Sequence, residues 1–587
     1  MAWCDQWLLG CLIPLALWTL ASGLDDLFIL FVWCLPRRKR PKPTSAALAR
    51  TPERRIAIFV PLWREDRVIG QMLQRTLSAV CYEKYDIFAG VYPNDEATAS
   101  AVREVAARWP RLHVATVPHE GPTSKGDCLN AIYNDMTAWE AARGVRFEII
   151  LTHDAEDLVY ADSLRLINWF SRDYEMVQIP VLPLPTPFRE FTHGVYCDEF
   201  AEFQLKDLVV RRLLGGFLPA NGVGTGFERD ALEALAAARG GVLFDPSCLT
   251  EDYETGYRLH QFGYRQMFVP IEIDGAGIAA TREFFPRRWK AAVRQRSRWI
   301  TGIVLQGWQR HGWRGPAWRM YWFWRDRKGI VGNLLSPLSN LLFLAGLWRW
   351  RELAKTPPAV AGLCSITLLV AAAHVLIRGR SSAMIYGWKF ALGVPFRMLW
   401  GNLVNLAATG MALRGFVASM AGLRKLTWTK TDHVYPPAGA GANLRLGEVL
   451  VRLRCLSAAQ IQAALAVQPR GVRLGEYLVQ SEQLSEENLY RALSQQAGLE
   501  LGLPRAGEVS APATHALPAN TSRRWRVLPY RVSAGQMHLL TPEIPTSEML
   551  RHLEEVATLE LRFRLVQPHD YDRMADRYLG PQPTVGR

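Results

Sequence analysis

The sequence predicts an α/β fold with a largely parallel sheet, joined to membrane helices and followed by a domain that is mainly helical and then α+β. Short strand-like segments alternate with helix-like segments between residues 52 and 328, which is typical of a parallel sheet. Long apolar runs lie on both sides of that region, and the last third of the chain contains a helical repeat. The 587 residues leave room for about three or four domains.

The composition excludes several classes of protein. Hydrophobic residues make up 49% of the chain and charged residues 21%, which excludes a mostly disordered protein. A mean hydropathy near zero excludes a transporter embedded in the membrane throughout. The nine cysteines contain no C-x-x-C pair, so neither a zinc site nor a disulfide framework is expected. The net charge of +14 leaves nucleic acid, a membrane surface and anionic small molecules open as partners.

The first 35 residues form an apolar run that we expect to anchor the chain in a membrane. A basic cluster, Arg37–Lys42, follows it directly, whereas a cleavable signal peptide carries its charge before the apolar run. Segments on the cytoplasmic side of a membrane carry an excess of Lys and Arg, so we expect the basic end of this apolar run to be cytoplasmic. Asp25 and Asp26 are costly in lipid, so we expect them to face other helices or to lie near an interface.

Two further apolar runs, Gly329–Leu347 and Ala359–Ile377, are predicted to cross the membrane. A third stretch, Ala383–Phe416, mixes apolar residues with charged ones and is predicted to be amphipathic and interfacial. Two crossings leave residues 52–328 and 430–587 both in the cytoplasm.

Acidic residues follow three of the predicted strands. The strand-like segments are Ile56–Leu62, Asp86–Tyr92, Leu112–Val117, Phe147–Thr152 and Met176–Leu182. The first, second and fourth are followed by Glu65 and Asp66, by Asp95 and Glu96, and by Asp154, Glu156 and Asp157. Ligands of parallel sheets bind at the carboxyl ends of the strands. Helix capping can explain any one of these three acidic groups. Three groups at one edge of the sheet would repel one another without a cation, so together they favour a bound divalent ion, Mg²⁺ or Mn²⁺.

Further along the chain, Lys125 lies at a turn that opens a helix, where it can meet a diphosphate or an acidic side chain. Glu251 and Asp252 begin another predicted helix, and one of them could serve as a general base. Residues 221–226 match half of a dinucleotide fingerprint but lack its strand–turn–helix setting, so we discount that match. No Ser/His/Asp or Cys/His nucleophilic set is apparent.

Gln295, Arg298 and Trp299 form a Q-x-x-R-W pattern in an arginine-rich, helix-like stretch. Together with the preceding acidic groups, this ordered set resembles family 2 glycosyltransferases, particularly membrane-bound processive ones. The resemblance covers about residues 52–328 and implies a GT-A type fold and an inverting, UDP-sugar-dependent transfer, which needs no protein nucleophile.

The resemblance also implies a role for each motif position. Asp95 would contact the uridine or ribose, and Pro61, Trp63, Glu65 and Lys125 complete the predicted donor site. Asp154 and Glu156 would hold the metal on the diphosphate, although Glu156 replaces the usual second aspartate. Asp252, with Glu251 beside it, would deprotonate the acceptor hydroxyl. Gln295, Arg298 and Trp299 would bind the diphosphate and the acceptor sugar.

The C-terminal third contains a repeat: Arg445–Leu450 recurs as Arg473–Leu478, 28 residues later. A duplicated helical unit explains its leucines but not its repeated Arg and Gln. The repeat resembles the N-terminal domain of type II secretion and pilus-extension ATPases, which binds cyclic di-GMP. The implied ligands are Arg445, Leu446, Gly447, Gln468, Arg473, Leu474, Gly475 and Gln496. Arg454 and Glu482 replace a usual glycine at the tenth position of the two motifs. The chain contains no P-loop, so it is not the ATPase itself.

The order of these parts resembles the phage N4 adsorption protein B family, inner-membrane glycosyltransferases associated with a surface glycan. The predicted boundaries are an anchor at 1–35, a basic linker at 36–51, the transferase domain at 52–328, two membrane helices with an interfacial segment at 329–429, a linker at 430–443 and a regulatory domain at 444–580. The resemblance implies a cyclic di-GMP-regulated transferase that extends an exopolysaccharide able to serve as a phage receptor. An N-acetylhexosamine is one candidate sugar, and a periplasmic or outer-membrane export partner is expected.

Two alternatives stay open: a transferase that adds one sugar to polyprenyl phosphate, and a non-catalytic signalling or phage-adsorption scaffold. A nucleic-acid partner ranks last because the basic residues flank the predicted membrane runs. Residues 36–55 hold 8 basic and 1 acidic side chains, and residues 282–328 hold 13 and 2. Such belts, with seven Trp in the second, are typical of a surface beside anionic lipid.

Overall fold

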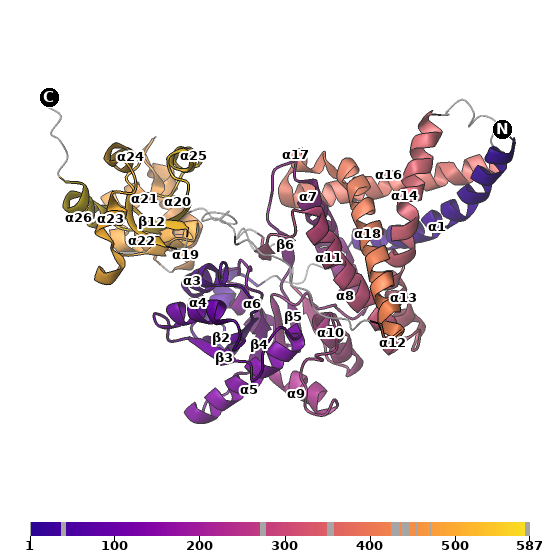
Figure 1. Ribbon diagram of the computed structural model, residues 1–587, viewed down its shortest axis with the longest axis horizontal. Helices are drawn as coiled ribbons and strands as arrows, with labels where there is room; N and C mark the ends of the chain where they lie inside the picture. Colours follow the sequence, from indigo (N-terminus) through magenta and orange to yellow (C-terminus); the bar gives the residue numbers. More distant parts are fainter. Residues whose placement is uncertain are drawn as a thin grey trace. The chain divides into compact units, whose positions relative to one another are not determined.

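A computed structural model gives the fold of the protein and separates it into two compact units (Figure 1). One unit comprises Met1–Leu73 and Tyr82–Tyr435, and the other Gln74–Cys81 and Pro436–Arg587. The structure describes residues 2–36, 43–269, 278–348, 357–423, 435, 446–453, 455–469, 471–533 and 535–580. The basic cluster Arg37–Lys42, the predicted linker 430–443 apart from Tyr435, Arg445 and Arg454 lie outside the described residues.

The first unit contains a seven-stranded, largely parallel sheet, as the sequence predicts. Its strand order is β3-β2-β1-β4-β7-β5-β8, with β7 antiparallel to both of its neighbours. The strands are β1 (Ile56–Pro61), β2 (Tyr85–Val91), β3 (Leu112–Thr116), β4 (Ile149–Thr152), β5 (Met176–Gln178), β7 (Thr225–Glu228) and β8 (Gln266–Phe268). The central strands are apolar on both faces because helices cover both sides of the sheet.

The helices of this sheet begin where polar residues cap them. Asp95 caps α4 (Glu96–Ala106), and Ser124 caps α5 (Lys125–Arg143). The other helices around the sheet are α3 (Ile69–Ala79), α6 (Ser163–Phe170), α9 (Arg229–Ala237) and α10 (Glu251–Gln261). Phe88 packs edge-on against Phe59 and Phe147 in the buried core between α5 and the sheet.

The segment Met176–Leu182, predicted as one strand, is divided in the structure. Pro180 follows β5, and the chain then forms β6 (Val181–Pro183), which pairs with β9 (Thr281–Glu283) in a separate two-stranded sheet. Proline cannot donate to a strand ladder, which accounts for the break.

Beyond β6, the chain forms helices that contain two π-helical segments. α7 (Phe191–Glu202) continues through the π-helix η1 (Phe203–Asp207) into α8 (Leu208–Leu213). α11 (Trp289–Trp299) continues through η2 (Ile300–Gln306) into α12 (Gly307–His311), and α13 (Ala317–Arg327) follows. π-helical segments occur often at functional sites.

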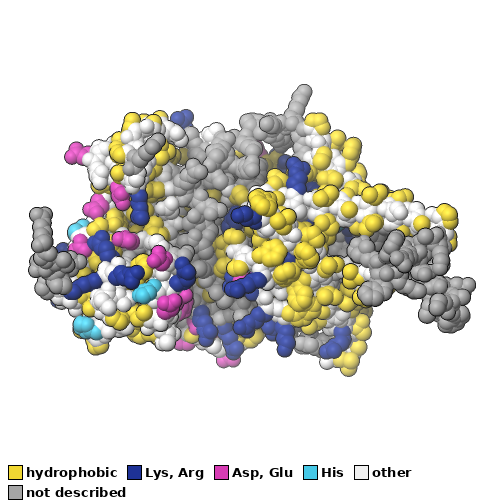
Figure 2. Space-filling view, turned by 90° about the horizontal axis from the view of Figure 1, so that it is seen from above, with side chains coloured by type: hydrophobic (Ala, Val, Ile, Leu, Met, Phe, Trp, Pro, Cys, Tyr) yellow, Lys and Arg dark blue, Asp and Glu magenta, His cyan; other side chains and the backbone are white. Residues whose placement is uncertain are grey.

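Among the residues that the structure describes, three helices are long and apolar enough to cross a membrane: Leu12–Cys34 within α1 (Ala2–Cys34), α16 (Pro358–Tyr386) and α18 (Val394–Met420). Helix α14 (Gly329–Trp348) covers the predicted run Gly329–Leu347 but is not among these three in the described part of the chain. α1 packs closely on α16, since a Cβ added at Gly23 would overlap Val370. Figure 2 shows hydrophobic side chains gathered over this region, with Lys and Arg beside them.

The structure differs from the prediction for Ala383–Phe416, which was expected to be interfacial. Most of this stretch lies in α18, which is long and apolar enough to span a membrane. Two of its polar residues face protein: Arg397 forms a buried pair with Asp198 of α7 at 2.7 Å, and Asn405 accepts a hydrogen bond from Arg296 of α11 at 2.7 Å. These two polar residues therefore contact helices of the transferase domain.

The second unit has four helices followed by a small sheet, as predicted. The helices are α19 (Leu446–Arg452), α20 (Ala458–Val467), α21 (Leu474–Gln480) and α22 (Glu486–Ala497). The sheet order is β10-β13-β12-β11, from β10 (Glu500–Leu501), β11 (Leu528–Ser533), β12 (Gln536–Thr541) and β13 (Glu560–Leu565). Helices α23 (Ala511–Thr514), α24 (Ala519–Arg524), α25 (Ser547–Val556) and α26 (Pro568–Leu579) accompany it.

Candidate functional site

A cavity of about 640 Å³ opens at the carboxyl ends of β1 and β4 and reaches helices α1 and α16. All of its lining residues belong to the first unit. Almost every residue predicted for the transferase site lines it: Pro61, Trp63, Glu65, Lys125, Asp154, Glu156, Glu251, Asp252, Gln295, Arg298 and Trp299. The fold therefore brings together side chains that are up to 238 positions apart in the sequence.

Asp95 is the exception among these residues, since it does not line the cavity. Its carboxylate accepts the backbone N–H of Arg64 at 2.5 Å and that of Thr98 at 3.5 Å. It thus joins the loop after β1 to the start of α4. A role for Asp95 in donor binding remains a prediction.

The first part of the cavity is a slot beside the ends of β1 and β2. Trp63 packs edge-on against Tyr92, with 5.3 Å between the ring centres. The Tyr92 hydroxyl lies 2.6 Å from Thr123 Oγ1, just before α5. A side chain at Gly121 would collide with both rings, so this close packing needs glycine there. The slot presents aromatic and hydroxyl groups to the cavity.

Lys125 begins α5 and lies between the other charged groups of the site. Its ammonium nitrogen is 2.6 Å from Asp154 Oδ1 and donates to the backbone oxygen of Gly222 at 3.1 Å. Burial lowers the pKa of Lys125, but the carboxylates of Asp154, Glu251 and Asp252 outweigh that effect and raise it. Lys125 therefore stays charged inside the cavity.

Asp252 lies in the first turn of α10, where its Oδ1 accepts the Tyr253 backbone N–H at 2.7 Å. Burial raises the pKa of its carboxyl, although Lys125 opposes the shift. Burial and the neighbouring Asp252 raise the pKa of Glu251 to about 7. Two adjacent carboxyls with raised pKa values at the wall of a cavity are typical of an acid–base site.

Gly222 is a site residue that sequence reasoning missed. Its φ is +75°, and an added Cβ would lie 2.6 Å from Asp252 Oδ2 and 3.2 Å from Lys125 Nζ. Only a glycine lets the backbone adopt this conformation so close to both the carboxylate and the ammonium group. The glycines of the N-G-V-G-T-G pattern at 221–226 indicate a backbone that needs glycine. The pattern was compared only with a dinucleotide fingerprint, so this indication was missed.

Asp154 and Glu156 follow β4 and supply carboxylate oxygens to the same cavity. Hard divalent ions prefer such ligands, and the pairing of Lys125 with Asp154 places a cation beside one of them. No group of three or more His, Cys, Asp or Glu side chains able to hold a metal occurs among the described residues. The chemistry of the two carboxylates fits a divalent metal.

The Q-x-x-R-W residues lie at the end of α11, before η2. Trp299 packs edge-on or tilted against Tyr196, Phe200 and Phe285, which hold its ring at the cavity wall. Arg298 and Gln295 line the same cavity as Asp252.

Three lining residues have buried polar atoms without a hydrogen-bond partner among the described residues: Asn221 Nδ2, Thr250 Oγ1 and Gln295 Oε1. Buried polar atoms are normally paired, because an unpaired one costs about 1–3 kcal/mol. Their position at one cavity is typical of a site that binds a polar ligand.

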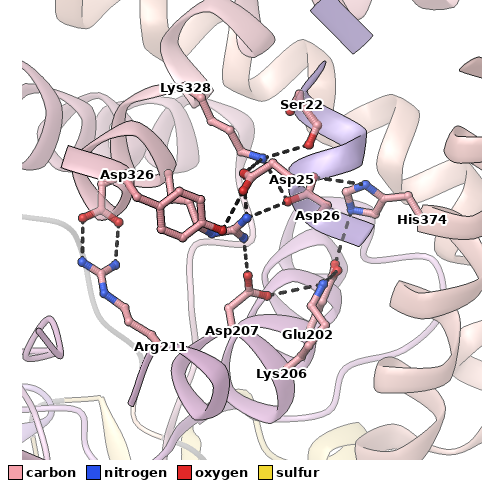
Figure 3. Close-up of polar contacts among 12 residues, drawn as sticks. Ser22, Asp25, Asp26, Glu202, Lys206, Asp207, Arg211, Asp326, Lys328 and His374 are labelled. Atoms are coloured by element: carbon pink, nitrogen blue, oxygen red, sulfur yellow. Dashed lines mark hydrogen bonds and ion pairs between the residues drawn. The ribbon is translucent and has the colours of Figure 1, made fainter. Parts of the chain in front are cut away.

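The other end of the cavity is a membrane-side chamber dominated by ion pairs (Figure 3). Its residues come from α1, α7, η1, α8, α13 and α16: Asp26, Glu199, Phe200, Glu202, Phe203, Lys206, Asp207, Arg211, Trp322, Arg325, Asp326, His374 and Arg378. Arg325 donates to Asp207 at 2.6 Å and to Asp25 at 2.7 Å, and Lys328 donates to Asp25 at 2.7 Å. Asp25 and Asp26 thus face protein, as the sequence predicts.

The two repeats of the second unit pack against each other through their glycines. A Cβ at Gly447 would meet Ile461 at 2.7 Å and Leu474 at 3.6 Å, and one at Gly475 would meet Leu489 at 2.6 Å and Leu446 at 2.9 Å. This reciprocal contact brings the starts of α19 and α21 together. Glu482 has a φ of +56°, so the position where a glycine is usual does adopt a left-handed conformation.

Comparison with known proteins identifies the parts of the chain. The model of the family described as "Glycosyltransferase like family 2" matches residues 52–302. The chain is 34% identical over 572 residues to bacteriophage adsorption protein B of Escherichia coli K12, covering 90% of this chain and 77% of that protein. The bacteriophage N4 adsorption protein B of Escherichia coli O157:H7 matches with the same identity and coverage.

Shorter or weaker likenesses concern single parts of the chain. The type IV pilus assembly ATPase PilB of Thermus thermophilus is 33% identical over 157 residues, which are 26% of this chain and 17% of that protein. The structure of MshE with cdg is 28% identical over 23% of this chain and 99% of that one, with a TM-score of 0.22. The mannosyltransferase PcManGT of Pyrobaculum calidifontis, in complex with GDP-Man and Mn²⁺, is 19% identical over 67% of this chain and 99% of that one, with a TM-score of 0.42.

The resemblances stated from the motifs are thereby confirmed for the transferase region and for the chain as a whole. With 34% identity over 90% of its length, the chain belongs to the bacteriophage N4 adsorption protein B family and is a family 2 glycosyltransferase with candidate membrane-spanning helices.

Proposed function

We propose that this protein is an inverting glycosyltransferase of the bacterial inner membrane, regulated by cyclic di-GMP, that moves a sugar from a UDP-sugar to a growing exopolysaccharide. The observation that carries the proposal is that Lys125 and Asp252 line one cavity and both lie close to Gly222. An acceptor hydroxyl needs a base, and the departing diphosphate needs a cation. The two groups supply both, from separate elements of the fold.

The reaction follows from these groups. The acceptor oxygen attacks the anomeric carbon of the donor sugar as its proton passes to a carboxylate oxygen of Asp252. The bond from that carbon to the diphosphate breaks, and UDP leaves with the bonding electrons. Lys125 and Arg298 balance the charge that develops on the leaving oxygens. One displacement inverts the configuration, and no nucleophile of the protein is consumed.

The donor would lie with its base in the slot of Trp63, Tyr92 and Thr123, and with its diphosphate toward Lys125. Asp154 and Glu156 would hold Mg²⁺ or Mn²⁺, which supplies further charge stabilisation to the leaving group when bound. In a metal-bound state, Lys125 is then available to the diphosphate. Trp299 is placed to stack on the acceptor sugar.

The C-terminal unit would bind the effector. Cyclic di-GMP is a cyclic dinucleotide with two guanosine units. The two repeats, which meet around Leu446 and Leu474, would each contact one of these units. Arg473, at the start of α21, and the Arg and Gln positions of both motifs would contact the guanines. Binding would be coupled to the transferase by a free energy that acts in both directions. We place the transferase domain, residues 52–328, and the C-terminal unit in the cytoplasm, with the basic belts beside anionic lipid.

A second acceptor, polyprenyl phosphate, is favoured by one observation: the cavity continues to α1 and α16, two of the helices able to span a membrane. The test of the main proposal is purified full-length protein in detergent, screened against UDP-sugars with Mg²⁺ or Mn²⁺, with and without cyclic di-GMP. We expect UDP release from one donor, lost in Asp252→Asn. Unchanged surface glycan in cells that carry Asp252→Asn would favour a scaffold role instead.

A further inference from the structure

The segment directly before α10, residues 244–250, leads into the first turn of the helix that carries Asp252. No residue of this fully described segment belongs to a helix or a strand. Thr250 stands at the N-cap position of α10, but its side chain makes no capping hydrogen bond to the described backbone. A carboxylate takes up a proton only within hydrogen-bonding reach, so Asp252 must be held in place. Contacts from other elements must therefore fix the start of α10.

Gln306, the last residue of the π-helix η2, holds this segment with both polar atoms of its carboxamide. Its Oε1 accepts the backbone N–H of Leu249 at 3.1 Å, and its Nε2 donates to the backbone oxygen of Ser247 at 3.3 Å. Gln306 is buried, with 8% of the residue exposed, and it does not line the cavity of Lys125 and Asp252. Any effect of Gln306 on the reaction therefore passes through the segment that it holds.

Gly302 of η2 contacts the same segment by close packing. A Cβ added at Gly302 would lie 2.5 Å from Oγ1 and 2.6 Å from Cγ2 of Thr250. A larger residue would therefore push Thr250, and with it the start of α10, out of place. Together, Gly302 and Gln306 hold the residues just before α10 against η2. π-helical segments occur often at functional sites, and this one supports the helix of Asp252.

The other end of the segment is fixed to α5, the helix that begins at Lys125. Asn130 Nδ2 donates to the backbone oxygen of Phe244 at 2.7 Å, and Asn130 Oδ1 accepts the Phe244 N–H at 3.0 Å. η2 in turn continues directly from α11, which carries the Q-x-x-R-W residues. The segment before Asp252 therefore joins the helix of the lysine to the helix of the Q-x-x-R-W residues.

We infer that Gln306 is a positioning residue of the transfer reaction: it holds the backbone before α10 so that Asp252 stays within reach of an acceptor hydroxyl. This inference rests on the proposed transferase function and adds to it a residue outside the cavity. Because the hydrogen bonds of Gln306 join this segment to the helix of Arg298 and Trp299, the base keeps a fixed place relative to these side chains. Loss of the hydrogen bonds should slow proton transfer and leave donor binding as it is.

The experiment measures UDP release by the purified full-length protein in lipid nanodiscs, with the donor that the screen selects. Gln306→Met keeps the length of the side chain but removes both hydrogen bonds. It should lower kcat about tenfold, because a small displacement of a reacting group is costly, while the KM for the donor changes by less than about twofold.

Asn168→Leu is the matched control for the loss of a buried carboxamide. Asn168 lies in α6 with 1% of the residue exposed, and its Nδ2 donates to the backbone oxygen of Pro52 at 2.9 Å. It does not line the cavity. Both substitutions should lower the midpoint of thermal unfolding, because each removes a buried hydrogen bond. Only Gln306→Met should lower kcat.

Two glycines of the same continuous helix give an independent test. Gly302→Ala presses on Thr250 and should lower kcat while the KM for the donor stays the same. Gly307→Ala is its control: the nearest atom that a Cβ there meets beyond its own helical turn is the backbone oxygen of Gly302, at 3.7 Å, which is an ordinary contact distance. This control should leave kcat and KM unchanged.

Three results would overturn the inference: an unchanged kcat in Gln306→Met, an equal loss of kcat in Asn168→Leu, or a higher KM for the donor in place of the loss of kcat. If Gln306→Met does not fold, equal rates in Gly302→Ala and Gly307→Ala would overturn it. In each case the unaltered chain still releases UDP, so the proposed transferase function survives. Absence of UDP release from the unaltered chain with every donor would instead contradict the proposed function, and the inference with it.

Discussion

The ammonium nitrogen of Lys125 lies 2.6 Å from an oxygen of Asp154, so the first residue of α5 and the loop after β4 share one ion pair. This pair joins the two halves of the candidate donor site. A metal on Asp154 and Glu156 would compete with Lys125 for the same carboxylate. A lysine displaced from Asp154 by the metal would be available to the diphosphate, so both the metal and the lysine would supply positive charge to it.

Removing the lysine charge should slow the transfer without preventing folding. Lys125→Met should lower kcat by about 10²-fold, because one preorganised donor to the leaving group contributes roughly that factor in other enzymes. Lys84→Met is the matched control, since Lys84 is exposed just before β2. A rate of UDP release that is equal in both variants would contradict the role given to Lys125.

Gly222 offers a test of the geometry around Asp252. Gly222→Ala places a methyl group 2.6 Å from Asp252 Oδ2 and also strains a backbone with a φ of +75°. Gly263→Ala has the same kind of strain, with a φ of +85°, but its Cβ meets nothing within 4 Å. We expect both variants to lose about 1–2 kcal/mol of stability, measured by thermal unfolding.

Only Gly222→Ala should lose transfer activity beyond that common effect, by at least about tenfold in kcat. If Gly263→Ala were equally inactive, strain alone would account for the loss, and the contact with Asp252 would have no part in it.

The pH dependence of the transfer should reflect the carboxyl pair of α10. Burial raises the pKa values of Asp252 and Glu251, the latter to about 7, and Asp252 must be ionised to accept a proton. The rate should therefore fall on the acidic side, as Asp252 becomes protonated at a higher pH than an exposed aspartate would. Glu251→Gln removes one of two neighbouring negative charges, which lowers the pKa of Asp252 and moves the acidic limb to lower pH.

The measurement is kcat/KM at a series of values between about pH 5 and pH 9, with the pair treated as one coupled titration. A profile that is flat on the acidic side, or one that Glu251→Gln moves to higher pH, would contradict this assignment.

The residues predicted for the transferase site belong to short motifs, each of which is defined by residues close together in the sequence. Acidic residues after strands, a lysine at a helix start and a Q-x-x-R-W helix can each be recognised within a few residues. The roles of Gly222 and the chamber could not be predicted, because they arise from contacts between distant segments. The role of Gly222 depends on Lys125 of α5 and Asp252 of α10, which both lie close to it only in the folded chain. The Arg325–Asp25 pair joins residues 300 positions apart. The sequence did not predict α18 as a candidate membrane span, because Arg397 and Asn405 have protein partners that only the fold reveals.

The ion pairs of Asp25 should be important for stability. Asp25 accepts from Tyr321 at 2.8 Å and from Arg325 and Lys328 at 2.7 Å. Asp25→Asn leaves two buried cations with fewer partners and should cost about 3 kcal/mol, seen as a lower midpoint of thermal unfolding in detergent. Asp66→Asn, at an exposed position after β1, should change the midpoint little. Equal midpoints for the two variants would show that the Asp25 pairs add no net stability.

Glu482 should be a point of strain in the second repeat. Its φ of +56° is unfavourable for a residue with a side chain, so Glu482→Gly should stabilise the local fold by about 1 kcal/mol. Slower hydrogen exchange in α21 and α22 of the full-length protein would show the gain. Gln483→Gly, one residue later and without a positive φ, should instead speed exchange. Faster exchange in Glu482→Gly would indicate that its side chain stabilises the turn.

The central claim is that cyclic di-GMP controls a sugar transfer that Asp252 carries out. The most direct measurement is UDP release by the full-length protein in nanodiscs, with and without cyclic di-GMP, for the unaltered chain, Arg473→Ala and Asp252→Asn. We predict that the effector changes the rate of the unaltered chain, that Arg473→Ala loses this response, and that Asp252→Asn releases almost no UDP. An unchanged rate in the unaltered chain, despite demonstrated binding of cyclic di-GMP, would contradict the account.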